Sequence, residues 1–285
     1  MKVTLLVNTC DAYHDVLDLF FSALNENWKL FNYEIIVNSE FIPYKNKKYN
    51  ITNSIYKADE NISGWGARVK KALLMTDSDY VIFMLDDYII ESSVDQERID
   101  EIIVFMSKNV EFSGHYLTLH PLNSNKKQIF KSSFKIDDCV AYKVNTGPAI
   151  WRRSILIDLL DDMDDPWSWE FFAQYKDNAS RLKLLTVGSK DSNIINYRSD
   201  LGGAIYRGKW VKEVVLDKVL EYNLSLNLAD RGFADFVKPE KRTFAWKLGF
   251  LQSGYRMIGI KSFLHFATHY FGSKILKLKD KLFLI

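Results

Sequence analysis

Short apolar runs alternate with amphipathic stretches along the first third of the chain. Apolar residues concentrate at 2–8, 33–37 and 79–85, and runs of this length suit strands that are covered on both faces. Between them, residues 14–28 carry apolar positions three and four apart, and a glycine-flanked tryptophan opens a second helical stretch at 64–75. This order of strand, helix, strand, helix and strand predicts an α/β fold with a mostly parallel sheet and right-handed crossovers.

The middle of the chain continues the alternation less regularly. Asp11 is expected to cap the first helix, and Pro166 stands where proline commonly begins one. The segment around Pro43, rich in lysine and asparagine, is interpreted as a loop. The remaining predictions are helices over 94–108, 152–161 and 167–178, two or more strands between 114 and 144, and a strand over 182–187.

Residues 238–285 differ from the rest in charge and pattern. They hold ten Lys and Arg and two acidic residues, a balance of +8, whereas the preceding residues carry a balance of −6. From Thr243 onward the pattern is helical, although Gly254 and Gly259 weaken the case for one unbroken helix. One apolar stripe joins Phe244, Leu248, Leu251, Tyr255 and Ile258. Such a basic amphipathic tail predicts contact with a membrane surface, and a helix packed on the body with a solvated lysine face fits equally well.

Composition narrows the class of protein. The chain has 285 residues, is 47% hydrophobic and carries a net charge of +2, so it can form a large core and gives no sign of a nucleic-acid partner. Cys10 and Cys139 match no metal or redox spacing and are interpreted as free thiols of a reducing cytosol. The N-terminal apolar run is too short for a secretory signal, and no 18-residue apolar stretch predicts a spanning helix. We therefore expect a cytoplasmic protein.

Two adjacent carboxylates end the third predicted strand. The apolar run Val81 to Leu85 stops on Asp86 and Asp87. Ligands of open α/β sheets bind beyond the carboxyl ends of the strands, and two acids there can hold a hard divalent cation, which can in turn hold a diphosphate. The same pair could instead be ordinary turn residues, because Asp hydrogen-bonds its own backbone.

A glycine-flanked basic loop follows later in the chain, over residues 202–210. Its Arg207 and Lys209 could close over phosphates and exclude water, although an ordinary surface loop with solvated charges has the same composition. The five histidines show no ligand spacing that we would assign to a metal.

The order of these features over residues 1 to 210 resembles the GT-A class of nucleotide-sugar glycosyltransferases, in particular the bacterial enzymes of capsular polysaccharide and O-antigen synthesis. Adjacent acids stand where that class has Asp-x-Asp, which leaves open which carboxylate meets the metal. The motifs that carry the resemblance are Asn8-Thr9-Cys10-Asp11, Asn38-Ser39-Glu40, Gly64-Trp65-Gly66-Ala67-Arg68, Met84-Leu85-Asp86-Asp87-Tyr88, Asn145-Thr146-Gly147-Pro148 and Asp164-Asp165-Pro166-Trp167-Ser168-Trp169-Glu170.

The resemblance implies a role for each motif. A Mn²⁺ or Mg²⁺ ion would lie on Asp86 and Asp87, and Glu170, with Asp165 as its substitute, would be the catalytic base of an inverting enzyme. The acceptor would meet Asn145, Gly147, Trp167 and Trp169. The nucleotide sugar, most commonly linked to UDP in this class, would meet Asn8, Thr9, Asp11, Asn38, Glu40, Arg68, Asp86, Arg207 and Lys209.

The implied organisation is a glycosyltransferase domain over 1–237, with a nucleotide-sugar half (1–110) and an acceptor half (111–237), and the basic tail over 238–285. The acceptor would be a saccharide or a lipid-linked saccharide, and the tail would bring the enzyme to the inner face of the plasma membrane. Two alternatives stay open. A nucleotidyltransferase would share the acid pair, but residues 8–13 lack the glycine and basic residues expected after its first strand. A non-catalytic carbohydrate-binding protein would use the tryptophans alone.

Overall fold

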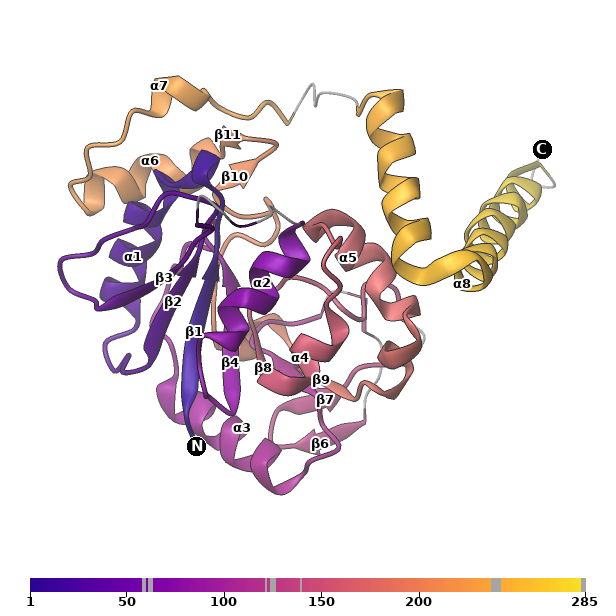
Figure 1. Ribbon diagram of the computed structural model, residues 1–285, viewed down its shortest axis with the longest axis horizontal. Coiled ribbons are helices and arrows are strands. Elements are labelled where there is room, and N and C mark those ends of the chain that lie inside the picture. Colours follow the sequence, from indigo (N-terminus) through magenta and orange to yellow (C-terminus); the bar gives the residue numbers. More distant parts are fainter. Residues whose placement is uncertain are drawn as a thin grey trace.

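The computed structural model describes residues 1–57, 60, 64–120, 122–123, 127–138, 140–236 and 242–282 (Figure 1). Its central sheet is built from β1 (Val3–Asn8), β2 (Glu34–Asn38), β3 (Ile51–Ser54), β4 (Tyr80–Leu85), β5 (Gly114–Tyr116), β6 (Gln128–Phe130), β7 (Ser133–Lys135), β8 (Ala149–Arg152) and β9 (Leu184–Val187). The helices are α1 (Val16–Asn27), α2 (Trp65–Leu74), α3 (Gln96–Lys108), α4 (Arg153–Leu159), α5 (Pro166–Phe172), α6 (Lys212–Glu221), α7 (Leu228–Arg231) and α8 (Phe244–Leu282). A hairpin of β10 (Ile205–Tyr206) and β11 (Lys209–Trp210) forms a second, two-stranded sheet.

Within the described residues the strand order is β3-β2-β1-β4-β8-β5-β9-β7-β6. β1 pairs in parallel with β2 and with β4, and β2 pairs in parallel with β3. β8 runs antiparallel to both β4 and β5, and β7 runs antiparallel to β9 and β6, whereas β5 and β9 are parallel. Only β7 and β8 of these nine strands therefore run against the rest, and the predicted α/β class with a mostly parallel sheet is confirmed.

Helices cover both faces of the sheet, and each face has its own apolar core. On one face α1, α3 and α6 pack over the side of β1 that carries Leu5 and Val7. On the other face α2, α4 and α5 pack over Leu6 of β1 and Phe83 of β4. Because successive residues of a strand point to opposite faces, the continuous apolar runs of β1 and β4 are what a doubly covered sheet requires.

Several elements differ from the sequence-based prediction. The predicted loop after β2 contains β3, whose Ile-Thr-Asn-Ser sequence lacks an apolar run because much of it is only partly buried. The helix predicted over 167–178 ends at Phe172 and is followed by 3₁₀ turns at Ala173–Tyr175 and Asp177–Arg181. β8 comes before the helix predicted at 152, and α6, α7 and the β10–β11 hairpin were not predicted.

The predicted C-terminal helical extension is confirmed as α8, which bends at Gly259. Gly259 has φ 69° and ψ 171°, a backbone conformation outside the helical region that glycine adopts readily. Before the bend α8 packs on α5, where a Cβ at Gly254 would lie 2.4 Å from a ring carbon of Phe172. Just beyond the bend, Phe263 and Phe266 still pack on Phe172. The later turns of α8 project away from the body (Figure 1). No helix among the described residues is both long and apolar enough to cross a bilayer.

Candidate functional site

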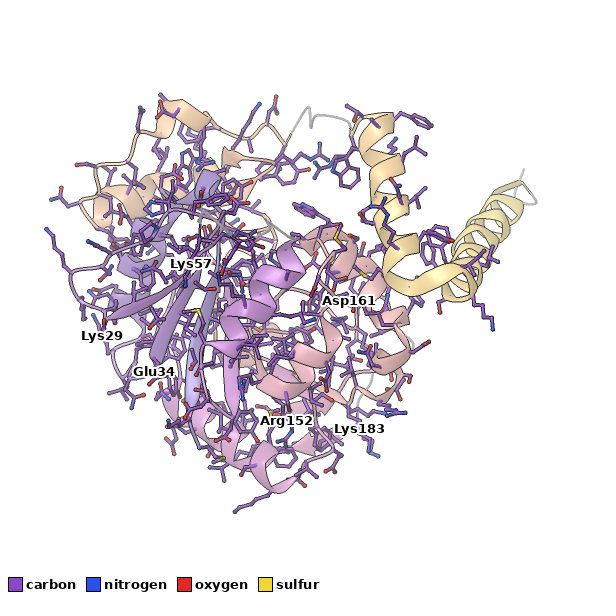
Figure 2. The ribbon with its side chains drawn as sticks, viewed as in Figure 1. Lys29, Glu34, Lys57, Arg152, Asp161 and Lys183 are labelled. Carbon is purple, nitrogen blue, oxygen red and sulfur yellow. The ribbon has the colours of Figure 1, made fainter. Side chains whose placement is uncertain are left out.

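A cleft of about 380 Å³ opens where β1 and β4 end. Its walls come from residues 8–10 and 12–13, residues 85–87, the start of α2, the start of α5, Thr146 and the β10–β11 hairpin. The helices and strands that carry these residues are labelled in Figure 1. A larger hollow of about 870 Å³ lies at the other end of the sheet. It is lined by Glu34, the first residue of β2, which is labelled in Figure 2. The cleft, and not the hollow, is at the carboxyl ends of parallel strands, where ligands bind in open α/β sheets.

The acid pair faces this cleft from the end of β4. Asp86 is only 3% exposed, its backbone N–H donates to the carbonyl of Asn8 at 3.1 Å, and its carboxylate accepts the hydroxyl of Thr9. Asp87 lies beside Gly203 so closely that a Cβ there would be 2.8 Å from Asp87 Oδ2. Asp87 Oδ1 is buried and has no hydrogen-bond partner among the described residues. A carboxylate oxygen in that position is suited to an external ligand.

The protein gives this pair little compensation for its charge. Burial raises the pKa of Asp86 to about 7, although the hydrogen bond from Thr9 opposes the rise. Burial also raises the pKa of Asp87 well above its ordinary value, and the neighbouring charges of Asp86 and Glu170 add to it. Desolvation and like charge both disfavour ionisation, so a bound cation would relieve both.

Arg207 lines the same cleft from the tight turn of the β10–β11 hairpin. It has φ 53°, and Gly203 and Gly208 nearby also have positive φ, a conformation for which glycine is suited. The guanidinium lies over the ring of Tyr206 at 5.1 Å, and its Nη1 is buried without a partner among the described residues. Among the described residues, the cleft wall thus includes a carboxyl oxygen of Asp87 and a guanidinium nitrogen of Arg207 that have no hydrogen-bond partner. Lys209, predicted to act with Arg207, is exposed on β11 and is not part of the cleft wall.

Glu170 reaches the cleft from α5 and is held by Thr146. The backbone N–H of Thr146 donates to Glu170 Oε1 at 2.9 Å, and the Thr146 hydroxyl donates to the same oxygen. The hydroxyl groups of Tyr88 and Thr146 are 3.3 Å apart, which ties this contact to the end of β4. Within the described residues Oε2 of Glu170 accepts no hydrogen bond, so one carboxylate oxygen is fixed by Thr146 while the other has no protein donor.

The structure separates the other residues predicted around Glu170. Trp167 lines the cleft and is 55% exposed, so one ring face can meet a sugar. Trp169 is 1% exposed and packs against Trp65 at 5.7 Å, which places its ring in the core, away from any acceptor. Asp165 is the N-cap of α5, and its carboxylate accepts the backbone N–H of Trp167 at 3.1 Å. Because the Asp165 carboxylate caps α5, it is not part of the cleft wall. Of the four residues predicted on this segment, Glu170 and Trp167 line the cleft, whereas Asp165 and Trp169 do not.

Asn145 and Gly147 lie beside the cleft wall and shape the turn that presents Thr146. The Gly147 N–H donates to Asn145 Oδ1 at 2.8 Å, and the Asn145 N–H donates to the Tyr116 hydroxyl at 2.9 Å. Both residues therefore position Thr146 and, through it, Glu170.

Two asparagines predicted to contact the nucleotide connect neighbouring strand ends. Asn38 Nδ2 donates to Asn8 Oδ1 at 2.9 Å, and Asn8 Nδ2 donates to the carbonyl of Met84 at 3.3 Å. The chain of amides crosses β2, β1 and β4. Asn8 lines the cleft, whereas Asn38 is 1% exposed beneath it.

The loops after β1 and β2 are locked together by charged side chains. Asp11 does not cap α1 as predicted, because its carboxylate accepts backbone N–H groups of residues 40–42. In return, the Asp11 N–H donates to Glu40 Oε2 at 3.1 Å. Arg68, from α2, donates to the carbonyl of Thr9 at 3.1 Å and lies 3.9 Å from Glu40 Oε1. Asp11 and Glu40 thus hold the loop, while Thr9 and Arg68 also line the cleft.

Three residues at this site were not predicted from the sequence. Thr146, which orients Glu170, lay between two residues that were selected and could have been included on that basis. Tyr13 and Arg231 carried no signal in the sequence. The Arg231 guanidinium pairs with Asp15 and lies 4.9 Å from the Tyr13 ring, so it fastens α7 to the loop after β1. Its positive charge also partly offsets the raised pKa of Asp86.

The two predicted free thiols have different outcomes. Cys10 is free and lines the cleft, and burial raises its pKa to about 11, so it is protonated at neutral pH. Cys139 lies outside the described residues.

The fit of a divalent cation depends on Asp86 and Asp87. The described residues contain no cluster of three or more His, Cys, Asp or Glu side chains suited to a metal. Mg²⁺ sites commonly use one or two carboxylates and complete their shell with water and substrate phosphates. Two buried carboxylates, one with an unpartnered oxygen, fit that kind of site.

Comparisons with known proteins were made on sequence and on structure. Neither a family model nor a curated protein matches the sequence. Among solved structures, S. aureus TarS residues 1–349 in complex with UDP is 13% identical, covers 81% of this chain and 68% of that chain, and has a TM-score of 0.48. TarS with UDP-GlcNAc is 15% identical over 81% and 69%, with a TM-score of 0.40. UDP-glucose pyrophosphorylase complexed with UDP-glucose is 11% identical over 68% and 96%, with a TM-score of 0.39. TM-scores below 0.5 carry no weight for function, which is inferred below from the cleft.

Proposed function

We propose that this protein is a glycosyltransferase that uses a nucleotide-sugar donor and inverts the anomeric centre. The proposal is supported by one cleft whose wall contains two polar atoms without a hydrogen-bond partner among the described residues and one carboxylate that is held in a fixed orientation. The groups are the unpartnered Asp87 Oδ1 and Arg207 Nη1, and the carboxylate is Glu170. A diphosphate with its cation satisfies the first two, and an acceptor hydroxyl satisfies the third.

The diphosphate would lie between the acid pair and the hairpin. Arg207 suits phosphate oxygens because a guanidinium offers several donors in a fixed plane and stays charged. A divalent cation on Asp86 and Asp87 would act as a Lewis acid on the leaving diphosphate. Thr9 keeps the Asp86 carboxylate in place, and the close approach of Gly203 holds the Asp87 carboxylate against the hairpin. The cation and the Arg207 guanidinium would together offset the negative charge of the acid pair and of the leaving diphosphate.

The acceptor would approach from the side of α5. Glu170 Oε2 would take the proton of a sugar hydroxyl while the hydroxyl oxygen attacks the anomeric carbon and the bond to the diphosphate breaks. Thr146 holds Oε1 by two hydrogen bonds and so fixes the direction of Oε2. Trp167, half-exposed at the wall, offers a flat face for a sugar ring. Glu170 on α5 and a diphosphate held by the acid pair and Arg207 would then lie on opposite sides of the donor sugar, as an in-line displacement with inversion requires.

We further propose uridine diphosphate donors and a saccharide or lipid-linked saccharide acceptor of a bacterial surface polysaccharide. These finer assignments follow the class that the sequence motifs resemble. Asn8, Thr9 and Arg68 line the part of the cleft nearest β1 and would contact the nucleoside.

A turnover assay tests the proposal. The purified protein is incubated with UDP-, GDP-, CDP- and dTDP-sugars, with and without Mn²⁺, and release of the nucleoside diphosphate is measured. One nucleotide is expected to support release, with Mn²⁺ stimulating it. Glu170→Gln should lose most of this release, whereas Glu213→Gln, on an exposed residue of α6, should keep it. Release by no donor, together with no thermal stabilisation by any nucleotide, would overturn the assignment.

A further inference from the structure

The part of α8 before Gly259 turns an apolar stripe to solvent. The face that packs on α5 carries Phe250 and Gly254, so a different face of the same helix is left uncovered. The residues of this stripe, spaced four, three and four apart, are Phe244 (74% exposed), Leu248 (51%), Leu251 (39%) and Tyr255 (46%). Contiguous apolar side chains on an exposed helix indicate an interaction surface.

The charge around this stripe is of one sign. The sequence contains no Asp or Glu between Lys241 and Lys279. Lys247, Arg256 and Lys261 are exposed on the described part of α8. An apolar stripe whose charged neighbours on the described part of α8 are all cations complements a surface that is apolar inside and anionic outside. An anionic lipid bilayer has this character.

We propose that α8 docks in the plane of an anionic membrane, with the stripe of Phe244, Leu248, Leu251 and Tyr255 inserted between the headgroups. A second copy of the chain is a poorer occupant, because two such helices would bring cations against cations. Insertion across the bilayer is excluded for the described residues of α8, which are not apolar enough to span it. The proposal concerns binding alone and stands whichever reaction the cleft performs.

The docking helix begins at the mouth of the cleft. The Arg242 guanidinium lies 4.3 Å from the Trp246 ring of α8 and 5.5 Å from the Trp167 ring of the cleft wall. Docking would therefore bring the acceptor side of the cleft close to the headgroups, where a lipid-linked saccharide could enter it. This consequence rests on the proposed function, whereas the docking itself does not.

Co-sedimentation with vesicles tests the docking without any nucleotide present. The full chain is mixed with phosphatidylcholine vesicles that contain about one third phosphatidylglycerol, and with phosphatidylcholine vesicles alone. Binding to the anionic vesicles is expected, with a loss of about tenfold or more in partition on removal of the anionic lipid or on addition of high salt. The stripe variant combines Phe244→Ser, Leu248→Ser, Leu251→Ser and Tyr255→Ser, and the charge variant combines Lys247→Glu, Arg256→Glu and Lys261→Glu.

Both variants should lose about tenfold or more of the wild-type partition. A control variant with three strongly exposed apolar residues changed elsewhere, Leu30→Ser, Val110→Ser and Leu220→Ser, should keep the wild-type partition. Equal partition of the stripe variant and the wild type would overturn the proposal. So would a wild-type dimer, measured by light scattering, that the stripe variant converts to a monomer without any vesicle binding by the wild type. Nucleotide binding, measured separately without vesicles, shows whether a failure belongs to the docking or to the proposed activity.

Discussion

Replacing Asp86 with asparagine removes a buried charge while it keeps the shape of the side chain. Asp86 is 3% exposed and accepts a hydrogen bond from the Thr9 hydroxyl. The amide oxygen of asparagine can accept the same hydrogen bond, so the main change is the loss of the carboxylate charge. We expect Asp86→Asn to stabilise the ligand-free protein at pH values above neutrality and to weaken its binding of a cation with a diphosphate.

The magnitude follows from the pKa of Asp86. Burial raises this pKa to about 7, from an ordinary value of about 3.9 in the unfolded chain. Below about pH 4, Asp86 is protonated in both the native and the unfolded protein. Between about pH 4 and 7 only native Asp86 keeps its proton, so the free energy of unfolding falls as the pH rises. Above about pH 7 the buried Asp86 charge lowers the free energy of unfolding by its full amount, about 4 kcal/mol. A weaker hydrogen bond from Thr9 offsets about 1 kcal/mol, which leaves a net gain of roughly 3 kcal/mol for the variant at about pH 8.

Urea unfolding at about pH 8 and about pH 5 measures this difference as free energies of unfolding. The stability advantage of Asp86→Asn over wild type should shrink by roughly 3 kcal/mol between the two pH values. Asp217→Asn, on an exposed residue of α6, should show no such dependence. An advantage that is equal at both pH values, or a variant that is less stable than wild type at about pH 8, would refute the account of Asp86 as an uncompensated buried charge.

Four further outcomes follow from the same site. Glu170→Gln should lower kcat by roughly 10²–10⁴-fold in initial-rate assays, with nucleotide affinity in a titration unchanged, and a mere loss of affinity would argue against a base. Arg207→Ala should weaken nucleoside diphosphate binding by roughly 10–100-fold in calorimetry, because it removes a charged hydrogen bond, and an unchanged Kd would place the diphosphate elsewhere. Gly203→Ala should cost about 1–3 kcal/mol in urea unfolding, since φ is +102° and the new Cβ would meet Asp87 Oδ2 at 2.8 Å; wild-type stability would contradict that geometry. Mn²⁺ affinity should rise with pH through about 7, because the cation competes with the Asp86 proton, and calorimetry at about pH 6 and pH 8 showing equal affinity would contradict this.

The sheet could be predicted where burial is visible in the sequence. β1, β2 and β4 lie side by side in the centre of the parallel half, and a strand covered on both faces needs an unbroken apolar run. β3 lies at the sheet edge, where Thr52 is exposed and Asn53 is half-buried, so no apolar run marks it. Of the two glycines that weakened the case for one unbroken helix, Gly259 breaks α8 by adopting a positive φ, whereas Gly254 stays helical and packs on Phe172.

The site was predictable only in part, because two decisive features depend on tertiary structure. Asp86 and Asp87 line the cleft as expected, because residues that directly follow a strand must lie at the end of that strand. On α5, Trp167 and Glu170 are three apart and share the cleft face, whereas Trp169 points into the core. The sequence Pro-Trp-Ser-Trp-Glu does not reveal which face is covered. Arg231 lies on α7, which is distant in sequence from the loop after β1. No sequence motif predicts its ion pair with Asp15.

A crystal of the protein grown with a nucleoside diphosphate and Mn²⁺ provides the most direct measurement of the central claim. Anomalous scattering from Mn²⁺ locates the metal independently of how the surrounding side chains are placed. The account predicts an anomalous peak between the carboxylates of Asp86 and Asp87 and the diphosphate, with Arg207 Nη1 donating to a phosphate oxygen. A diphosphate bound outside this cleft, or a metal bound away from both carboxylates, would contradict it.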